Sequence, residues 1–157
     1  MHKKILSICC CLLTAVLLFG CGGSQQSLSG SASDIADALK DGGTFEEELN
    51  ALDENMLSRV YNVSEDTLSD WKVYIGSGAT AEEIAVFIAK DEQSAQAVLS
   101  AVEERLSDRK DSYRDYVPKE LPKLEDAVVL QEGNYVVFCV SGDSEQAKEC
   151  LEQFRNS

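Results

Sequence analysis

The chain has 157 residues, with 14 lysines and arginines against 28 aspartates and glutamates, which gives a formal net charge of −14. This length accommodates one domain with short appendages, and a hydrophobic fraction of 44% is too high for a wholly disordered chain. The acidity argues against a nucleic-acid partner, because the chain has too little positive charge to release counterions from phosphates.

Residues 1–20 have the features of a secretory signal peptide. Two lysines are followed by an apolar run from Ile5 to Phe19, which only Ser7 and Thr14 interrupt. The run is too short to cross a bilayer comfortably, since a spanning helix needs about 20 apolar residues. We therefore expect this segment to be cleaved from the mature chain.

The four residues Leu18-Phe19-Gly20-Cys21 resemble the lipobox of bacterial lipoproteins, although Phe19 stands where a small residue is usual. The resemblance implies cleavage between Gly20 and Cys21 and a diacylglyceryl group on the Cys21 sulfur. Two acyl chains give a durable anchor, whereas one gives only marginal attachment. We expect the mature protein on the outer face of the cytoplasmic membrane. A plain secretory signal or a weak membrane helix is the alternative.

Residues 21–33 are expected to form a flexible tether, and residues 34–157 a single domain. The tether is rich in glycine and serine, and twelve such residues have an end-to-end distance of roughly 20 Å. Cleavage removes two lysines and no acids, so the mature charge is 12 − 28 = −16. This charge is expected to keep a tethered domain soluble, and it favours cationic partners.

The start of the domain is expected to be helical. Ser33 and Asp34 predict the cap of a helix that ends before Gly42-Gly43. Thr44 and Glu47 then form a capping-box pattern. Apolar residues recur after it at spacings of three or four, which indicates one helical face. These residues are Phe45, Leu49, Leu52, Met56 and Val60. A break near Asp53 to Asn55 leaves Glu54 to Tyr61 as a second piece.

Two strands follow and are expected to form a hairpin. Trp71 to Ile75 alternates apolar and polar side chains, which predicts a strand, and Gly76 to Thr80 is expected to be a turn. Ile84 to Ala89 is ambiguous, because the preceding Thr80-Ala81-Glu82-Glu83 is typical of a helix cap. Its β-branched residues favour a strand, and we choose that interpretation.

From Asp91 the apolar spacing predicts a long helix that ends near Tyr116, because Pro118 disfavours a helical residue before it. Its expected inner face holds Ala95, Val98, Leu99, Val102, Leu106 and Tyr113, and its charged residues, which include Arg105 and Arg109, are expected on the outer face. Pro118 to Asp126 is expected to be a loop.

The C-terminal part is expected to add a second hairpin and a helix. Ala127–Gln131 and Tyr135–Val140 are predicted strands, and Gly133-Asn134 is the turn between them. Asp143 or Ser144 caps the last helix. Its apolar face is Ala147, Cys150, Leu151 and Phe154. Together these elements predict an α+β domain. Its two β-hairpins, joined by the long helix, form one antiparallel four-stranded sheet. Helices pack on one face of this sheet, and the N-terminal lead-in is helical.

No catalytic residue, metal ligand or cofactor is predicted in the mature chain. The one histidine of the full chain, His2, lies in the signal segment, so the mature chain has none. This excludes the usual nucleophile–histidine pairs and histidine-containing zinc sites. The loop Gly76 to Thr80 lacks the lysine that ends a phosphate-binding loop. The acidic stretches Glu65-Asp66 and Asp143 to Glu145 lack the alternation of a calcium loop.

Cys139 and Cys150 are the only cysteines left after cleavage and lipidation. An oxidising compartment permits a disulfide between them, and free buried thiols are equally compatible with the sequence. Another candidate is the second face of the sheet, where Tyr74, Phe87 and Val129 are expected opposite the core. This face is either covered by the lead-in residues Phe45, Leu49 and Val60 or open to a partner.

The segments WKVYIGSGATAEEIAVFIAK, from Trp71 to Lys90, and SYRDYVPKELPKLEDAVVLQEGNYVVFCVS, from Ser112 to Ser141, resemble the domain-of-unknown-function family 4358 of small Gram-positive lipoproteins. The resemblance covers about Phe45 to Phe154. It implies a lipid-anchored, extracytoplasmic α+β domain, and it brings no assigned activity, substrate or catalytic residue.

These observations favour a non-enzymatic interaction module, attached to the membrane by its anchor, with a cell-envelope protein or wall component as partner. The alternative is a small-ligand-binding lipoprotein associated with a transporter, although 157 − 20 = 137 residues is small for a two-lobed binding protein. An enzyme that uses only carboxylates would need two acids facing each other in a cleft, and the sequence singles out no such pair.

Overall fold

The structure is a computed structural model that describes residues 27–155. The signal segment, the cleavage position at Gly20 and Cys21, and the lipidation of Cys21 therefore lie outside the described residues.

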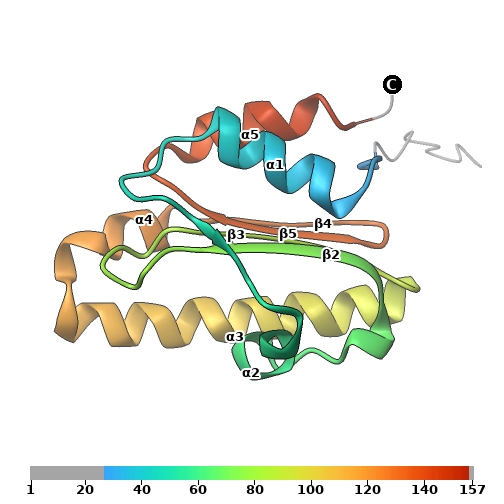
Figure 1. The fold of residues 1–157 in the computed structure, drawn as a ribbon, viewed down its shortest axis with the longest axis horizontal. Helices are drawn as coiled ribbons and strands as arrows, with labels where there is room; N and C mark the ends of the chain where they lie inside the picture. Colours follow the sequence, from blue (N-terminus) through green and yellow to red (C-terminus); the bar gives the residue numbers. More distant parts are fainter. Residues whose placement is uncertain (1–26, 156–157) are drawn as a thin grey trace, which may run out of the picture.

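The fold is α+β, with one antiparallel sheet between two layers of helices (Figure 1). The sheet has five strands in the order β1-β2-β3-β5-β4, so the predicted count of four was wrong. The strands are β1 (Asn50–Ala51), β2 (Leu68–Ile75), β3 (Glu83–Ala89), β4 (Val128–Glu132) and β5 (Tyr135–Val140). The four longer strands are the predicted ones, and β1 is the addition.

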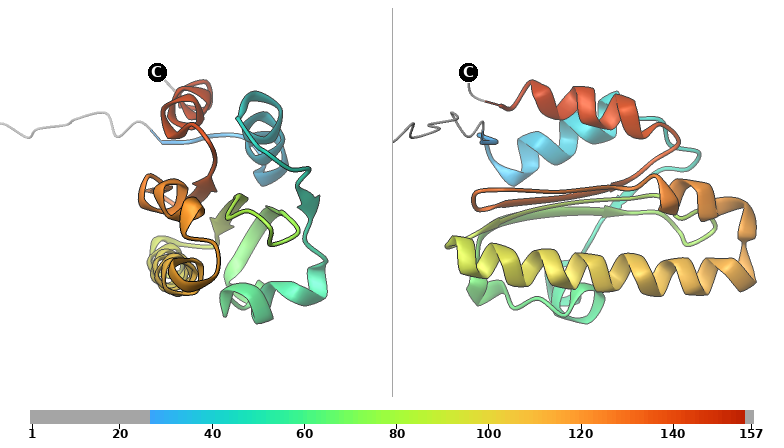
Figure 2. Two further views of the ribbon diagram at one scale, coloured as in Figure 1. Left: turned by 90° about the vertical axis from the view of Figure 1, so that its left-hand side faces the viewer. Right: turned by 180° about the vertical axis from the view of Figure 1, so that it is seen from behind.

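Helices cover both faces of the sheet. The sequence predicted helices on one face and left the other either to the lead-in residues or to a partner. α1 (Ala32–Gly42) and α5 (Ser144–Glu152) lie on one side, and α3 (Glu92–Tyr116) with α2 (Leu57–Tyr61) lies on the other (Figure 2). The reason is that β3 and β5 are buried on both faces, and each apolar face requires a cover. α4 (Leu121–Glu125) follows α3, and short 3₁₀ turns, η1 (Glu54–Met56), η2 (Glu65–Thr67) and η3 (Pro118–Glu120), complete the described chain.

The chain enters the fold earlier than the sequence predicted. Leu28 is only 2% exposed and forms an isolated β-bridge with Arg155. α1 begins at Ala32, because the side chain of Ser31 accepts a hydrogen bond from the Asp34 N–H in a capping box. Residues 27–33 therefore belong to the folded domain rather than to the tether.

The helix predicted from the capping-box pattern at Thr44 is absent. Residues 44–49 are irregular, and the chain then pairs with β2 through β1. The side chain of Glu47 bonds to the loop between β2 and β3, and so does not cap a helix. The second predicted piece, Glu54 to Tyr61, is helical and consists of η1 followed by α2.

The long helix and the C-terminal elements were predicted well. Asp91 accepts a hydrogen bond from the Ser94 N–H and caps α3, and Asp143 caps α5 in the same way. The expected loop after Pro118 contains η3 and α4. None of the helices among residues 27–155 is long and apolar enough to cross a membrane.

Candidate functional site

The end of the sheet at which β3 begins contains a cluster of buried charges. Glu82 and Glu83 are 0% exposed and Glu120 is 1% exposed. Successive side chains of an extended chain point to opposite sides, so Glu82 and Glu83 have different partners. Burial of an ionised carboxylate is costly unless it is paired and hydrogen-bonded, and the partners of these three side chains therefore define the cluster.

Glu83 points toward α3 and is held by arginine. Arg105 donates two hydrogen bonds to it, each of 2.8 Å, from Nε to Oε1 and from Nη2 to Oε2. The hydroxyl of Tyr61 donates a third, and Arg109 Nη1 lies 3.5 Å from Oε2. This arrangement is the bidentate geometry that makes arginine–carboxylate pairs strong. Burial and the neighbouring Glu83 carboxylate both raise the pKa of Tyr61, so its hydroxyl remains a proton donor.

Glu82 points to the other side and binds backbone groups. Its carboxylate accepts hydrogen bonds from the N–H of Glu46, at 2.9 Å to each oxygen, and from the N–H of Glu47 at 3.3 Å. Lys123 Nζ adds a bond of 2.9 Å. These bonds hold the irregular segment 44–49 against the start of β3, which explains why it does not form a helix.

Lys123 joins two of the buried carboxylates. Its Nζ lies 2.9 Å from Glu82, 3.2 Å from Glu120 and 2.7 Å from the exposed Glu46. Burial alone would lower the pKa of Lys123, but hydrogen bonds to the three carboxylates raise it above its usual value. Glu120 also accepts a bond of 3.0 Å from the N–H of Ala81. Lys123 is therefore the cation that holds η3 and α4 against the sheet.

Glu47 occupies the loop Gly76 to Thr80. It accepts hydrogen bonds from the N–H and Oγ of Ser77, at 3.0 and 2.6 Å, and from Thr80 Oγ1 at 2.6 Å. Bonds to Ser77 and Thr80 lower the pKa of Glu47 to about 2. The loop therefore binds the Glu47 carboxylate of the chain itself, at the position where a phosphate-binding loop would bind its anion. This agrees with the prediction that Gly76 to Thr80 is a turn.

The cluster is balanced in charge. Three buried carboxylates, Glu82, Glu83 and Glu120, face three cations, Arg105, Arg109 and Lys123. Within the cluster, only Arg109 Nε is a buried side-chain atom without a hydrogen-bond partner. We call these six residues the charge network. Its acids bind residues of the chain itself.

The sequence interpretation missed the charge network. Glu82 and Glu83 entered that interpretation only through the alternative of a helix cap, which was set aside in favour of a strand. Arg105 and Arg109 were expected on the outer face of the long helix. Both arginines instead face the sheet, with 16% and 15% of their side chains exposed. A usable signal was present, because two adjacent acids stand at the start of the apolar strand β3 and two arginines stand four residues apart on the longest helix.

The predicted cysteine pair is present as two free thiols. Cys139 is 1% exposed in β5 and Cys150 is 9% exposed in α5. Burial raises the pKa of the Cys139 thiol to about 12 and also raises the pKa of Cys150. The structure therefore has the free thiols and not the disulfide.

The proposed interaction face of Tyr74, Phe87 and Val129 does not exist as one surface. Antiparallel partners share a face, and Phe87 lies opposite Trp71. Phe87 is 0% exposed on the α3 side, where its ring meets Tyr61 at a centroid distance of 5.1 Å. Val129 lies on the same side, whereas Tyr74 lies on the α1 side and donates a hydrogen bond to Asp37. The prediction that Phe45, Leu49 and Val60 cover the second face of the sheet was confirmed in part. Phe45 and Leu49 pack on the side of Tyr74, but Val60 packs on the side of α3.

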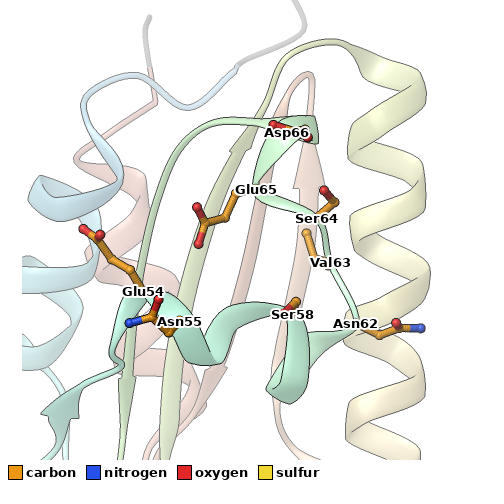
Figure 3. Close-up of a pocket in the computed structure, with 8 residues that line it drawn as sticks. All are labelled: Glu54, Asn55, Ser58, Asn62, Val63, Ser64, Glu65 and Asp66. Carbon is orange, nitrogen blue, oxygen red and sulfur yellow. The ribbon is translucent and has the colours of Figure 1, made fainter.

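Two depressions of the surface are relevant to binding. The first, of about 580 Å³, is open and polar, and η1, α2 and η2 surround it (Figure 3). Its acids are Glu54, Glu65 and Asp66, all exposed. Among residues 27–155, no group of three or more acidic, cysteine or histidine side chains is placed to hold a metal ion. The second, of about 290 Å³, is a groove beside β4 with Leu151 of α5 on its other side.

Comparison with known proteins identified one family. A family model described as domain of unknown function DUF4358 matches residues 43–141. No curated protein and no solved structure matches the chain. The matched range includes all six residues of the charge network and all five strands, and it leaves out α1 and α5. The chain therefore belongs to the DUF4358 family.

Proposed function

We propose that this protein is a lipoprotein, anchored through Cys21 to the outer face of the cytoplasmic membrane, and that it acts there as a non-enzymatic interaction module for a cell-envelope protein or wall component. The observation that carries the non-enzymatic part is the charge network. A general acid or base must reach a proton of the substrate. Here each buried carboxylate is held by cations and N–H groups of the chain itself.

The entry of the chain into the fold supports a close anchor. Leu28 is buried, and only 28 − 21 = 7 peptide units separate it from Cys21. Seven units reach at most about 25 Å. The same end of the molecule carries the turn between β4 and β5, because the Tyr135 hydroxyl donates to the carbonyl of Gly30 at 3.0 Å. That end would therefore face the bilayer, and the loop Gly76 to Thr80 would face away (Figure 2).

The surface charge suits a protein that stands off the membrane and binds another molecule. The charge network is neutral, so the charge of −16 of the mature chain lies outside it. Such a surface is repelled by anionic lipid headgroups and attracts positively charged partners, at distances up to a Debye length of about 8 Å at physiological salt.

The anchor is tested by expressing the full chain in a Gram-positive host as wild type, Cys21→Ala and the matched control Cys11→Ala. Wild type and Cys11→Ala should sediment with membranes, and their mature N-terminal peptide should carry the mass of a diacylglyceryl group. Cys21→Ala should lose both properties. Equal membrane binding by Cys21→Ala would overturn the anchor.

The interaction role is tested on the same cells by amine-reactive cross-linking. Wild type should give one discrete adduct, and release of the chain from the membrane in Cys21→Ala should reduce it strongly. A panel of metabolites in a thermal-shift assay covers the ligand-binding alternative. A large stabilisation by a single compound class would replace the interaction module with a small-ligand carrier, because ligands that bind the folded state raise its stability.

A further inference from the structure

One edge of the sheet is unprotected, and it belongs to β4. Within residues 27–155, β4 pairs only with β5. The N–H of Ala89 donates to the carbonyl of Asn134 at 2.8 Å, so Asn134 bonds toward β3. Bonding direction alternates along an antiparallel strand, and Tyr135 and Val137 therefore bond toward β4.

The register then identifies the free backbone groups of β4. Glu132 pairs with Tyr135 and Leu130 with Val137, so both bond to β5. The N–H and C=O groups of Val129 and Gln131, which alternate with them, point to the open edge. Such a row of groups is a template for another strand.

The opposite edge of the sheet is protected. β1 covers the end of β2, where Ala51 pairs with Tyr74. Further along β2, the N–H of Trp71 donates to the side chain of Asp70 at 2.9 Å. β4 has no such devices, since its sequence Val-Val-Leu-Gln-Glu contains no proline or lysine and its pairing with β5 has no bulge. The two edges thus differ in their capacity to accept a strand.

A groove runs beside this edge and would receive side chains of an added strand. Ala127 to Leu130 line one side of it, and Leu151 lines the other. Its rim is charged and consists of Lys148, Glu152 and Arg155. An extended peptide directs alternate side chains to one face, so every second residue would enter this groove while the backbone bonds to Val129 and Gln131.

Exposed acids stand at the start of the edge, where Glu125 and Asp126 precede β4. Glu132 ends the strand, but Arg155 Nη2 pairs with it at 2.6 Å. Lys148, on the rim of the groove, pairs with Glu145 at 2.5 Å. The start of the edge therefore favours a strand that carries positive charge beside Glu125 and Asp126.

We propose that the free edge of β4 binds an extended, positively charged peptide segment of another protein by strand addition. This inference rests on the proposed function, for which it names the binding surface and the chemistry of the partner. Backbone bonds at Val129 and Gln131 provide attachment, and the groove beside Leu151 selects apolar side chains. Glu125 and Asp126 select lysine or arginine at the start of the edge.

The test uses the full chain in detergent micelles and a capped peptide, acetyl-Lys-Val-Thr-Val-Thr-Val-Lys-amide. The matched control peptide has glutamate in place of both lysines. Amide chemical shifts report where each peptide binds. The lysine peptide should shift the amides of Val129 and Gln131 first, and the glutamate peptide should bind at least ten-fold more weakly.

Two variants of the edge separate the contribution of backbone hydrogen bonds to peptide binding from the contribution of charge. Val129→Pro removes an N–H that β5 does not use, and proline is tolerated on edge strands. The pair Glu125→Lys and Asp126→Lys reverses the charge at one end. Each variant should bind the lysine peptide at least ten-fold more weakly than wild type does. The matched control, Glu65→Lys with Asp66→Lys, makes the same charge change at the opposite edge and should leave binding within two-fold.

Four results would overturn strand addition at β4: no shift at millimolar peptide, equal binding of both peptides, shifts centred on Glu65 and Asp66, or a dimer formed through β4. The anchor mass on the same preparations separates this inference from the proposed function. An anchored chain without a β4 response refutes only strand addition. A β4 response in a chain that lacks the anchor refutes only the lipoprotein assignment.

Discussion

Glu83 at the start of β3 and Arg105 in the middle of α3 are joined by two hydrogen bonds of 2.8 Å, although 22 residues separate them in the chain. Arg105 also donates to the carbonyl of Val60 at 3.1 Å, so one guanidinium ties α3 to the sheet and to α2. Apolar contacts alone would allow a helix of 25 residues to shift along the sheet. The pair fixes its position, which is the best supported role of buried polar groups.

Arg105→Met should destabilise the fold more than Arg109→Met. Removing Arg105 leaves the Glu83 carboxylate buried without its bidentate partner, which costs about 3–5 kcal/mol. Arg109 is a matched control on the same helix face, because it lies 3.5 Å from Glu83 and its Nε atom has no partner. Urea denaturation of both variants measures the free energies of unfolding. Equal losses would show that Arg105 acts through packing rather than through its bonds.

Lys123→Met should be destabilising for a related reason. It leaves Glu82 and Glu120 buried and without their common cation, with an expected cost of about 3 kcal/mol or more. Lys119→Met is the control, since Lys119 is 71% exposed and lies 3.9 Å from Glu120. Such a surface pair contributes about 0–1 kcal/mol.

A double-mutant cycle then tests whether Lys123 acts through charge. Glu120→Gln removes one of the two carboxylates that Lys123→Met leaves unpaired. The double variant should therefore be more stable than the sum of the single losses predicts, as expected for residues in one network. Additive losses in the same urea titrations would contradict the ion-pair explanation.

The sequence predicted the elements whose signals are local. The alternation in 71–75 and 135–140 and the spacing of three and four in 91–116 depend only on neighbouring residues, and all three elements are present. The prediction of a strand at 84–89 was correct for the same reason. The prediction of which side chains share a face was wrong, because the side on which Phe87 lies depends on the register with Trp71.

The failures all involve contacts between distant residues. Segment 44–49 has helical spacing, but the N–H groups of Glu46 and Glu47 bond to Glu82, about 36 residues later. Lys123 reaches Glu82 across 41 residues. No periodicity records such pairs, so tertiary bonds override local propensity here. The adjacent acids and the spaced arginines are visible in the sequence, but their pairing into the charge network is outside what pattern analysis predicts.

Glu47→Gln should change how stability depends on pH. The folded pKa of Glu47 is about 2 against an ordinary 4.5, because Ser77 and Thr80 donate hydrogen bonds to the carboxylate. A carboxyl with a lowered folded pKa adds stability that is complete above about pH 4.5 and is lost as the pH falls toward 2. The difference between wild type and Glu47→Gln should therefore be largest at neutral pH and should shrink across that interval.

The measurement is urea denaturation at intervals from pH 7 to about pH 2, with an NMR titration of the Glu47 carboxyl. Glu48→Gln is the matched control, because Glu48 is exposed and only its backbone carbonyl takes part in a hydrogen bond. Its stability difference from wild type should stay flat over the same range. A difference for Glu47→Gln that does not vary with pH would place the stabilisation in packing instead of in ionisation.

Cys139 and Cys150 should resist alkylation in the folded protein. The thiolate is the reactive form, and burial raises the pKa of Cys139 to about 12, so little thiolate exists at neutral or mildly alkaline pH. Iodoacetamide at about pH 8 should leave Cys139 unmodified until guanidinium unfolds the chain, and should reach the slightly more exposed Cys150 first. Peptide mapping by mass spectrometry assigns each site. Peptides of the two cysteines that stay linked without reductant, with the mass lower by two hydrogens, would instead show a disulfide.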